Sequence, residues 1–185
     1  MPVFISLLRG INVGGHKPIK MDALSALYKA IGLGDVQTVL QSGNVVFTAK
    51  TRGSKPLTKQ IEDAIEQKFG HHCDVILRTS SELKQVIANN PFAKRPNIEP
   101  GKLGIVFFKE APAKEKCEDV LRMKSPAEEV HMNGREFYIY FADGMGQSKL
   151  FATISRKLTS GTTRNWNTVT KLLQTAESLQ QALSS

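Results

Sequence analysis

The spacing of hydrophobic and polar residues predicts six elements in the first 80 residues. The segment 3–9 (VFISLLR) is a continuous apolar run typical of a buried strand, and residues 21–31 place their apolar side chains on one helical face. Two β-branched runs then flank Ser42-Gly43, which indicates a hairpin. The predicted strands are 3–9, 36–41, 44–49 and 73–78, and the predicted helices are 21–31 and 54–69. This β-α-β-β-α-β order is the split βαβ, or ferredoxin-like, motif.

The segment 89–101 (NNPFAKRPNIEPG) holds three prolines and a glycine, which makes it the best domain boundary in the chain. We therefore predict a ferredoxin-like half at 1–80, a linking helix and Pro-rich loop at 81–101, and a second ferredoxin-like half with C-terminal helices at 102–185. The second half reads β-α-β-β-α-α, with strands at 103–108, 128–132 and 136–141, helices at 112–124, about 150–158 and about 169–183, and no fourth strand. The predicted fold class is α+β, with the two halves packed together and an extra helix at the C-terminus.

Several predicted strands are apolar on both faces. Val3, Ile5 and Leu7 alternate with Phe4 and Leu8, and the strands at 103–108 and 136–141 follow the same rule. A sheet with one open face would alternate apolar and polar residues. Both sheets should therefore be covered on both sides, and the binding surfaces should lie at loops and helix ends.

Composition narrows the class of protein. No apolar run approaches the roughly 20 residues of a membrane span, and no basic stretch precedes the short apolar run at the start, so we expect a soluble protein without a signal segment. Cys73 and Cys117 fit no metal or CxxC spacing, which favours reduced, buried thiols in a cytoplasmic protein. A secreted protein with one disulfide is the alternative.

The basic charge is concentrated toward the two ends of the chain. The net charge is +8, and it divides into +6 for residues 1–60, −2 for residues 61–143 and +4 for residues 144–185. If the two ends meet in space, they form one positive surface that favours anionic partners. The alternative is an ordinary solvated surface of a basic protein.

The glycine-rich loop between the first strand and the first helix, LRGINVGGHKPIKM (8–21), is the strongest candidate for an anion site. Glycines allow positive φ, which lets successive backbone N–H groups converge on an anion near a helix N-terminus. Lys17 and Lys20 supply positive charge. The loop matches neither the P-loop nor the dinucleotide fingerprint. A tight crossover turn is the alternative.

The loop DGMGQSKL (143–150) also connects a predicted strand to a predicted helix. Gly144 and Gly146 loosen the backbone, Ser148 can cap the helix, and Lys149 is basic. This is a second anion-site shape without a specific motif, and an ordinary turn is again the alternative.

Two further stretches carry groups that can bind bases or phosphates. Trp166, the one tryptophan, stands among Arg164, Asn165 and Asn167 in TTRNWNTVTKL (162–172), where an aromatic ring beside arginine could stack on a base. Alternatively, Trp166 fills a gap in the core while Asn167 or Thr168 caps the last helix. Gln41, Ser42 and Asn44 in QSGN (41–44) form a polar hairpin tip, for which a turn needs these residue types in any case.

Together LLRGINVGG (7–15), QSGNVVF (41–47), DGMGQSKL (143–150) and TTRNWNTV (162–169) resemble domain-of-unknown-function family sixteen ninety-seven, a mostly bacterial family. The resemblance extends from residue 3 to about residue 175. It implies two paired ferredoxin-like halves and brings no established activity. The positions that match its motifs here are Arg9, Gly10, Asn12, Gly14, Gly15, Gln41, Ser42, Gly43, Asn44, Gly146, Ser148, Lys149, Arg164, Asn165, Trp166 and Asn167.

These residue types suit binding of an anion or a nucleobase better than acid–base catalysis. Our hypothesis is a cytoplasmic module that binds a phosphate-bearing ligand, either nucleic acid or a nucleotide, through the two glycine loops, Lys17 and the segment 164–167. One alternative is an enzyme acting on a small phosphorylated or amide-containing metabolite, with Asp143 or His16 moving protons. Another is a structural or interaction module without a small ligand. No cofactor is expected, and His71-His72-Cys73 supplies adjacent residues rather than one coordinating face, so no metal is expected.

Overall fold

A computed structural model describes residues 1–12, 18–51 and 53–184 of the protein. The described chain is mixed α+β, with two four-stranded antiparallel sheets and six α-helices. It divides into two compact units. Unit 1 comprises residues 1–85 and 171–185, and unit 2 comprises residues 86–170.

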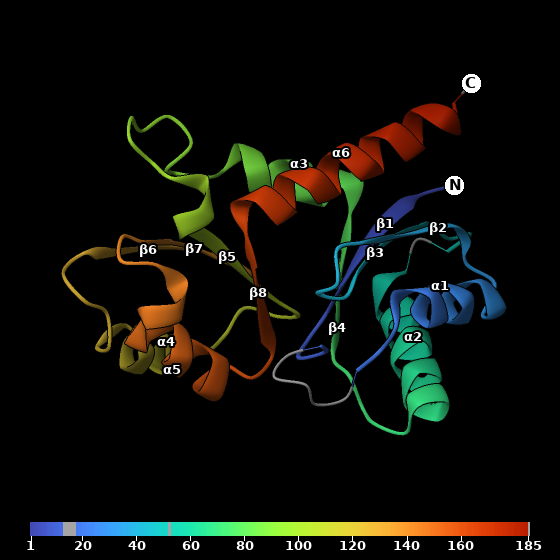
Figure 1. The fold of residues 1–185 in the computed structure, drawn as a ribbon, viewed down its shortest axis with the longest axis horizontal. Helices are drawn as coiled ribbons and strands as arrows, with labels where there is room; N and C mark the ends of the chain where they lie inside the picture. Colours follow the sequence, from blue (N-terminus) through green and yellow to red (C-terminus); the bar gives the residue numbers. More distant parts are fainter. Residues whose placement is uncertain (13–17, 52, 185) are drawn as a thin grey trace. The chain divides into compact units, whose positions relative to one another are not determined.

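Unit 1 contains the first sheet, whose strand order is β2-β3-β1-β4 with every neighbouring pair antiparallel. Helices α1 and α2 lie together on one face of this sheet (Figure 1). The elements are β1 (Val3–Leu8), α1 (Met21–Ala30), β2 (Gly34–Val39), β3 (Asn44–Thr48), α2 (Ser54–Phe69) and β4 (Val75–Thr79). The predicted order of these six elements is confirmed, with ends that differ by at most two residues.

Unit 2 contains the second sheet, in the equivalent order β6-β7-β5-β8 and again antiparallel throughout. Helices α4 and α5 pack on one face of it. The elements are β5 (Leu103–Phe108), α4 (Lys114–Leu121), β6 (Glu128–Asn133), β7 (Glu136–Phe141), α5 (Lys149–Lys157) and β8 (Gly161–Asn165), with short 3₁₀ turns at Pro100–Lys102 and Met145–Gln147. Two further helices, α3 (Ser80–Ala88) and α6 (Trp166–Ala182), each contribute residues to both units.

The prediction that strands are buried on both faces is confirmed. Every residue of β1, β3 and β5 is buried. In β1, Phe4 and Leu8 belong to the core beneath α1 and α2, while Ile5 and Leu7 on the opposite face are equally inaccessible. Buried apolar area of this kind is the main favourable contribution to folding. Accessible polar side chains lie in the loops, on the outer faces of the helices and on the edge strands β2 and β6.

A buried tyrosine in each unit has a hydrogen-bond partner. In unit 1 the Tyr28 hydroxyl shares a hydrogen bond of 2.9 Å with Ser6, and burial raises the pKa of that tyrosine. In unit 2 Tyr138 donates to the Val86 carbonyl at 2.7 Å, and burial raises its pKa to about 12. Cys73 and Cys117 are buried free thiols, as predicted.

The prediction that the second half lacks a fourth strand is wrong. Residues 161–165 form β8, which pairs with β5 and places Arg164 opposite Ile105. The sequence GTTRN has no apolar alternation, because its buried positions hold Gly161, Thr162 and Arg164 rather than Val or Ile. As a result α6 begins at Trp166, earlier than the predicted start near residue 169.

With β8 in place, the two sheets repeat each other residue by residue at their last strands. Arg78 of β4 lies opposite Ile5, just as Arg164 of β8 lies opposite Ile105. The next residue caps the following helix in both cases. The Thr79 hydroxyl accepts from the Glu82 backbone N–H at 3.1 Å, and the Asn165 side chain accepts from the Thr168 backbone N–H at 2.8 Å.

Candidate functional site

The structure brings two of the predicted motifs together at one end of the sheet in unit 1. The side chain of Asn12 donates to the Gln41 carbonyl at 2.9 Å and to the Ile19 carbonyl at 3.0 Å, and it accepts from the Ile19 N–H at 2.8 Å. Asn12 itself has a φ of 56°, and asparagine tolerates this left-handed conformation better than most residues. One amide side chain thus fixes both ends of the glycine loop and joins it to the β2–β3 hairpin.

On the hairpin side, this contact depends on the close approach of Gly43 to Leu8 and Ile11. Gly43, at a φ of 74°, accepts from the Leu8 N–H at 2.8 Å. A Cβ on Gly43 would lie 2.7 Å from Cγ1 of buried Ile11 and 3.0 Å from Cβ of Leu8, so only glycine fits. Asn44 is fully buried and donates to the Val39 carbonyl and the Ser42 hydroxyl, each at 2.9 Å. Ser42 and Asn44 therefore shape the turn, while Gln41 is exposed.

We call Arg9, Gly10, Asn12 and residues 41–44 the sheet-end cluster. It adjoins the N-terminus of α1, because Asn12 bonds Ile19 and Lys20 is the N-cap residue of that helix. The side chain of the N-cap residue Lys20 makes no capping hydrogen bond, and the first turn of α1 carries one acid, Asp22. Uncapped N–H groups at a helix start attract anions. The predicted residues Gly14, Gly15 and Lys17, with His16, lie outside the described residues.

The second glycine loop, in unit 2, is occupied by an internal carboxylate. Ser148 caps α5 by accepting from the Phe151 N–H at 2.9 Å, as predicted, and its hydroxyl donates to the buried carboxylate of Glu128. The other oxygen of Glu128 accepts from the Ser125 N–H at 2.8 Å. The N-terminus of α5, which favours a negative charge, therefore already has the Glu128 carboxylate beside it. Gly146 and Lys149 are exposed beside it, as is Asp143.

The segment 162–167, which contains Trp166, makes structural contacts in unit 2. Arg164 is 7% exposed and donates to the Thr162 hydroxyl at 2.7 Å and to the Thr163 carbonyl at 3.0 Å. Asn165 is the cap of α6, so the expectation that Asn167 or Thr168 caps it is wrong. Trp166 is half-buried as the first residue of α6, and Asn167 is exposed.

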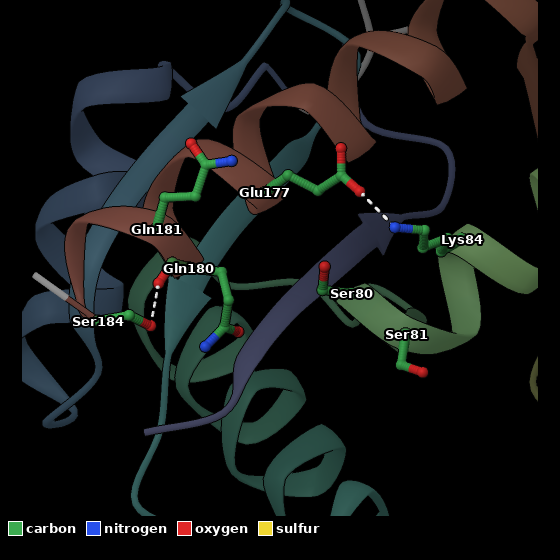
Figure 2. A pocket seen from close by; sticks show the side chains of 7 residues that line it. All are labelled: Ser80, Ser81, Lys84, Glu177, Gln180, Gln181 and Ser184. Carbon is green, nitrogen blue, oxygen red and sulfur yellow. Dashed lines mark hydrogen bonds and ion pairs between the residues drawn. The ribbon is translucent and has the colours of Figure 1, made fainter.

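Unit 1 also has a polar groove between α3 and α6 that the sequence analysis did not single out. It has a volume of about 670 Å³, and Figure 2 shows the side chains that line it. The lining residues are Ser80, Ser81, Lys84, Glu177, Gln180, Gln181 and Ser184. Lys84 and Glu177 form an ion pair of 3.1 Å across it, and Ser184 bonds the Gln180 carbonyl along α6. No single stretch of sequence marks this groove, because its two sides lie more than 90 positions apart.

The fold and these sites define a class: an α+β protein with two sheets of equivalent strand order. The chain belongs to the family described as "Protein of unknown function (DUF1697)", whose model matches residues 1–138. A search of curated proteins finds no significant match. Among solved structures, the chain is similar to the conserved bacterial protein SP0830 from Streptococcus pneumoniae, with a TM-score of 0.76 and 20% sequence identity over 96% of this chain and 99% of that one. This similarity is evidence for the fold alone. Within the described ranges, no helix combines the length and apolar character needed to cross a membrane.

Proposed function

We propose that the protein binds a phosphate-bearing ligand, a nucleotide or nucleic acid, at the sheet-end cluster and the N-terminus of α1. The observation that carries the proposal is the Asn12 side chain, which makes three hydrogen bonds of 2.8–3.0 Å across the loop and the hairpin. These bonds hold Ile19, and with it the start of α1, against the end of the sheet. A fixed helix N-terminus without a side-chain cap presents N–H donors for a phosphate oxygen.

Charge around this helix start favours an anion only on balance. Lys20 is exposed at the N-cap, and Arg9 lies at the end of β1. Asp22 in the first turn opposes an incoming phosphate. Residues 1–60 nevertheless carry a net charge of +6, so the long-range field around this part of the chain attracts anions.

The proposal rests mainly on the first loop because the other motifs have internal partners. Ser148 is bonded to Glu128, whose carboxylate would repel a phosphate. Arg164 is buried and bonded within β8. The wider hypothesis keeps four further candidate contacts, for which the support is weaker. They are Gly146, Lys149, Trp166 and Asn167.

We also propose that each half has the ferredoxin-like arrangement and that the protein works in the cytoplasm. Support for the first comes from the β-α-β-β-α-β order and the equivalent strand orders of the two sheets. Support for the second comes from two buried thiols that form no disulfide.

The test compares two lysines on one helix. Lys20 is the N-cap residue of α1 and Lys29 lies in its last turn, and both are exposed. Binding of a fluorescein-labelled single-stranded RNA is followed by anisotropy at 50 and 200 mM salt, with ATP as competitor. Lys20→Ala should weaken binding severalfold and lower the salt slope by about 0.7, the value for one phosphate contact on a single strand. Lys29→Ala should have little effect.

Asp22→Asn gives an opposite and independent result. Removing the acid from the first turn of α1 should tighten binding, since a like charge next to the phosphate is lost. Competition by ATP would identify a nucleotide site, and its absence a polymer site. Equal effects of Lys20→Ala and Lys29→Ala, or no binding of either probe, would reject the proposal.

A further inference from the structure

We propose that Glu62, His72 and Asp74 of unit 1 form a binding site for a divalent transition-metal ion such as Zn²⁺. Each residue offers one donor atom, and these atoms all lie within 4.8 Å of one another in the described part of the chain. A set of one imidazole nitrogen and two carboxylate oxygens matches the ligands that Zn²⁺ takes, with a fourth position open to water. The site adjoins the sheet-end cluster, because the Asp74 carbonyl accepts from the Arg9 N–H at 2.9 Å, but it uses different side chains and its test needs no nucleotide.

Local structure explains why these three side chains meet. Cys73 is buried, so its neighbours His72 and Asp74 project away from the core of unit 1. Glu62 lies in the middle of α2, about two turns before the end of that helix, and its side chain reaches the start of β4. The prediction of no metal rests on the adjacency of His71, His72 and Cys73 in sequence. The fold supplies a further donor, Glu62, from ten positions before His72.

The carboxylate of Glu62 is held in place by a hydrogen bond to the backbone. One of its oxygens accepts from the Val75 N–H at 2.8 Å, which fixes that carboxylate over the segment 72–75. A hydrogen bond of this kind orients a metal-binding carboxylate. The main chain at Asp74 is also fixed, because its carbonyl accepts from the Arg9 N–H at 2.9 Å.

The two ring nitrogens of His72 face different carboxylates. Its Nε2 lies 3.5 Å from Oδ1 of Asp74, while its Nδ1 lies 3.7 Å from Oε2 of Glu66. Two ligands on a tetrahedral Zn²⁺ stand about 3.3 Å apart at ordinary bond lengths, close to the first distance. Glu66 lies on the side of the second nitrogen, where a metal-bound histidine usually has a carboxylate partner, although at 3.7 Å it is an ion-pair contact and not a hydrogen bond.

Charge also favours a cation here. Glu62, Glu66 and Asp74 bring three carboxylates to one imidazole, so the group carries a net negative charge even when His72 is protonated. The His72 side chain is 54% exposed, which leaves its ring free to turn and draw the donor atoms onto an ion. The competing interpretation is a plain ion pair between protonated His72 and its acidic neighbours, and the experiment separates the two.

The experiment uses untagged protein stripped with EDTA, titrated with ZnCl₂ by calorimetry and with CoCl₂ by visible absorption. The variants are His72→Asn and Glu62→Gln, and the matched control is His131→Asn, an exposed histidine of unit 2. Glutamine keeps an oxygen for the Val75 N–H, so the fold is retained, and circular dichroism checks this. Wild type and His131→Asn should bind one equivalent of Zn²⁺ and show a Co²⁺ ligand-field band.

His72→Asn and Glu62→Gln should each weaken Zn²⁺ binding at least tenfold and abolish the Co²⁺ band. Glu66→Gln should weaken it about tenfold while the band remains, because outer-shell changes cost roughly 10- to 100-fold in affinity. Absence of saturable binding in the wild type would overturn the site and leave the ion pair. Equal affinity in wild type and His72→Asn would also overturn it.

Discussion

Gly43 shows how a single residue determines the geometry of the sheet-end cluster. Its positive φ lets the hairpin carbonyl reach the Leu8 N–H, and its missing side chain leaves the space that Ile11 fills. Asn12 completes the contact with three hydrogen bonds. The conformation of the candidate site thus depends on residues that a ligand need not touch.

At this scale we predict that Gly43→Ala destabilises the protein by about 2–4 kcal/mol, the sum of a left-handed conformation and an overpacked contact. Gly10→Ala is the matched control, because Gly10 has a φ of 67° but an added Cβ would have no atom of the described residues within 4 Å. That variant should lose only about 1 kcal/mol. Urea unfolding followed by circular dichroism measures both, and equal losses would show that packing at Gly43 contributes nothing.

At the scale of the element, the start of α5 illustrates a helix end satisfied from within. Ser148 caps the helix and also bonds the buried carboxylate of Glu128 from the start of β6. A cap and a buried acceptor depend on the same hydroxyl. The loop that resembles an anion site in sequence therefore already holds an internal carboxylate, which would repel a phosphate.

We predict that Ser148→Ala costs about 2–3 kcal/mol, from a lost cap of about 1 kcal/mol and a buried carboxylate left short of a donor. Ser54→Ala is the control, since Ser54 is the exposed first residue of α2 and the N-cap residue of that helix is Gly53, which has no side chain. It should change stability by no more than about 0.5 kcal/mol. Thermal unfolding compares the two, and a Ser148→Ala variant as stable as Ser54→Ala would contradict the assignment.

At the scale of the whole molecule, the two halves repeat a buried arginine at the same register. Arg78 is 1% exposed opposite Ile5, and Arg164 is 7% exposed opposite Ile105. Each donates to a carbonyl of its own strand, and each precedes the cap of the helix that follows. This repetition indicates a structural role that both halves share.

We therefore predict that Arg78→Ala and Arg164→Ala each cost roughly 2–4 kcal/mol, because both remove buried hydrogen bonds and the packing of the aliphatic stem. Arg122→Ala, at an exposed arginine after α4, should cost less than about 0.5 kcal/mol. Denaturant titration measures all three. An Arg164→Ala variant that keeps its stability but loses RNA or nucleotide affinity would instead place Arg164 in a ligand site.

Much of the architecture could be predicted because hydrophobic spacing is a local property. Leu57, Ile61 and Ile65 lie on one face of α2, and they are buried as their spacing requires. β8 could not be predicted in this way, since its buried positions are polar or glycine and gain their partners only from β5. The contact between the first glycine loop and the QSGN hairpin could not be predicted either, because Asn12 and Gln41 are 29 positions apart.

The sequence by itself determined the order of most elements, the family and the set of candidate site residues. Hydrophobic periodicity and motifs depend on residues that are neighbours along the chain, so they can be recognised without knowledge of the fold. Only the tertiary structure decided which polar groups are engaged internally, as with Ser148 and Arg164, and which stand together, as with Glu62, His72 and Asp74. The reason is physical: hydrogen bonding and ion binding depend on distances in space, and those are set by strand pairing and helix packing between distant segments.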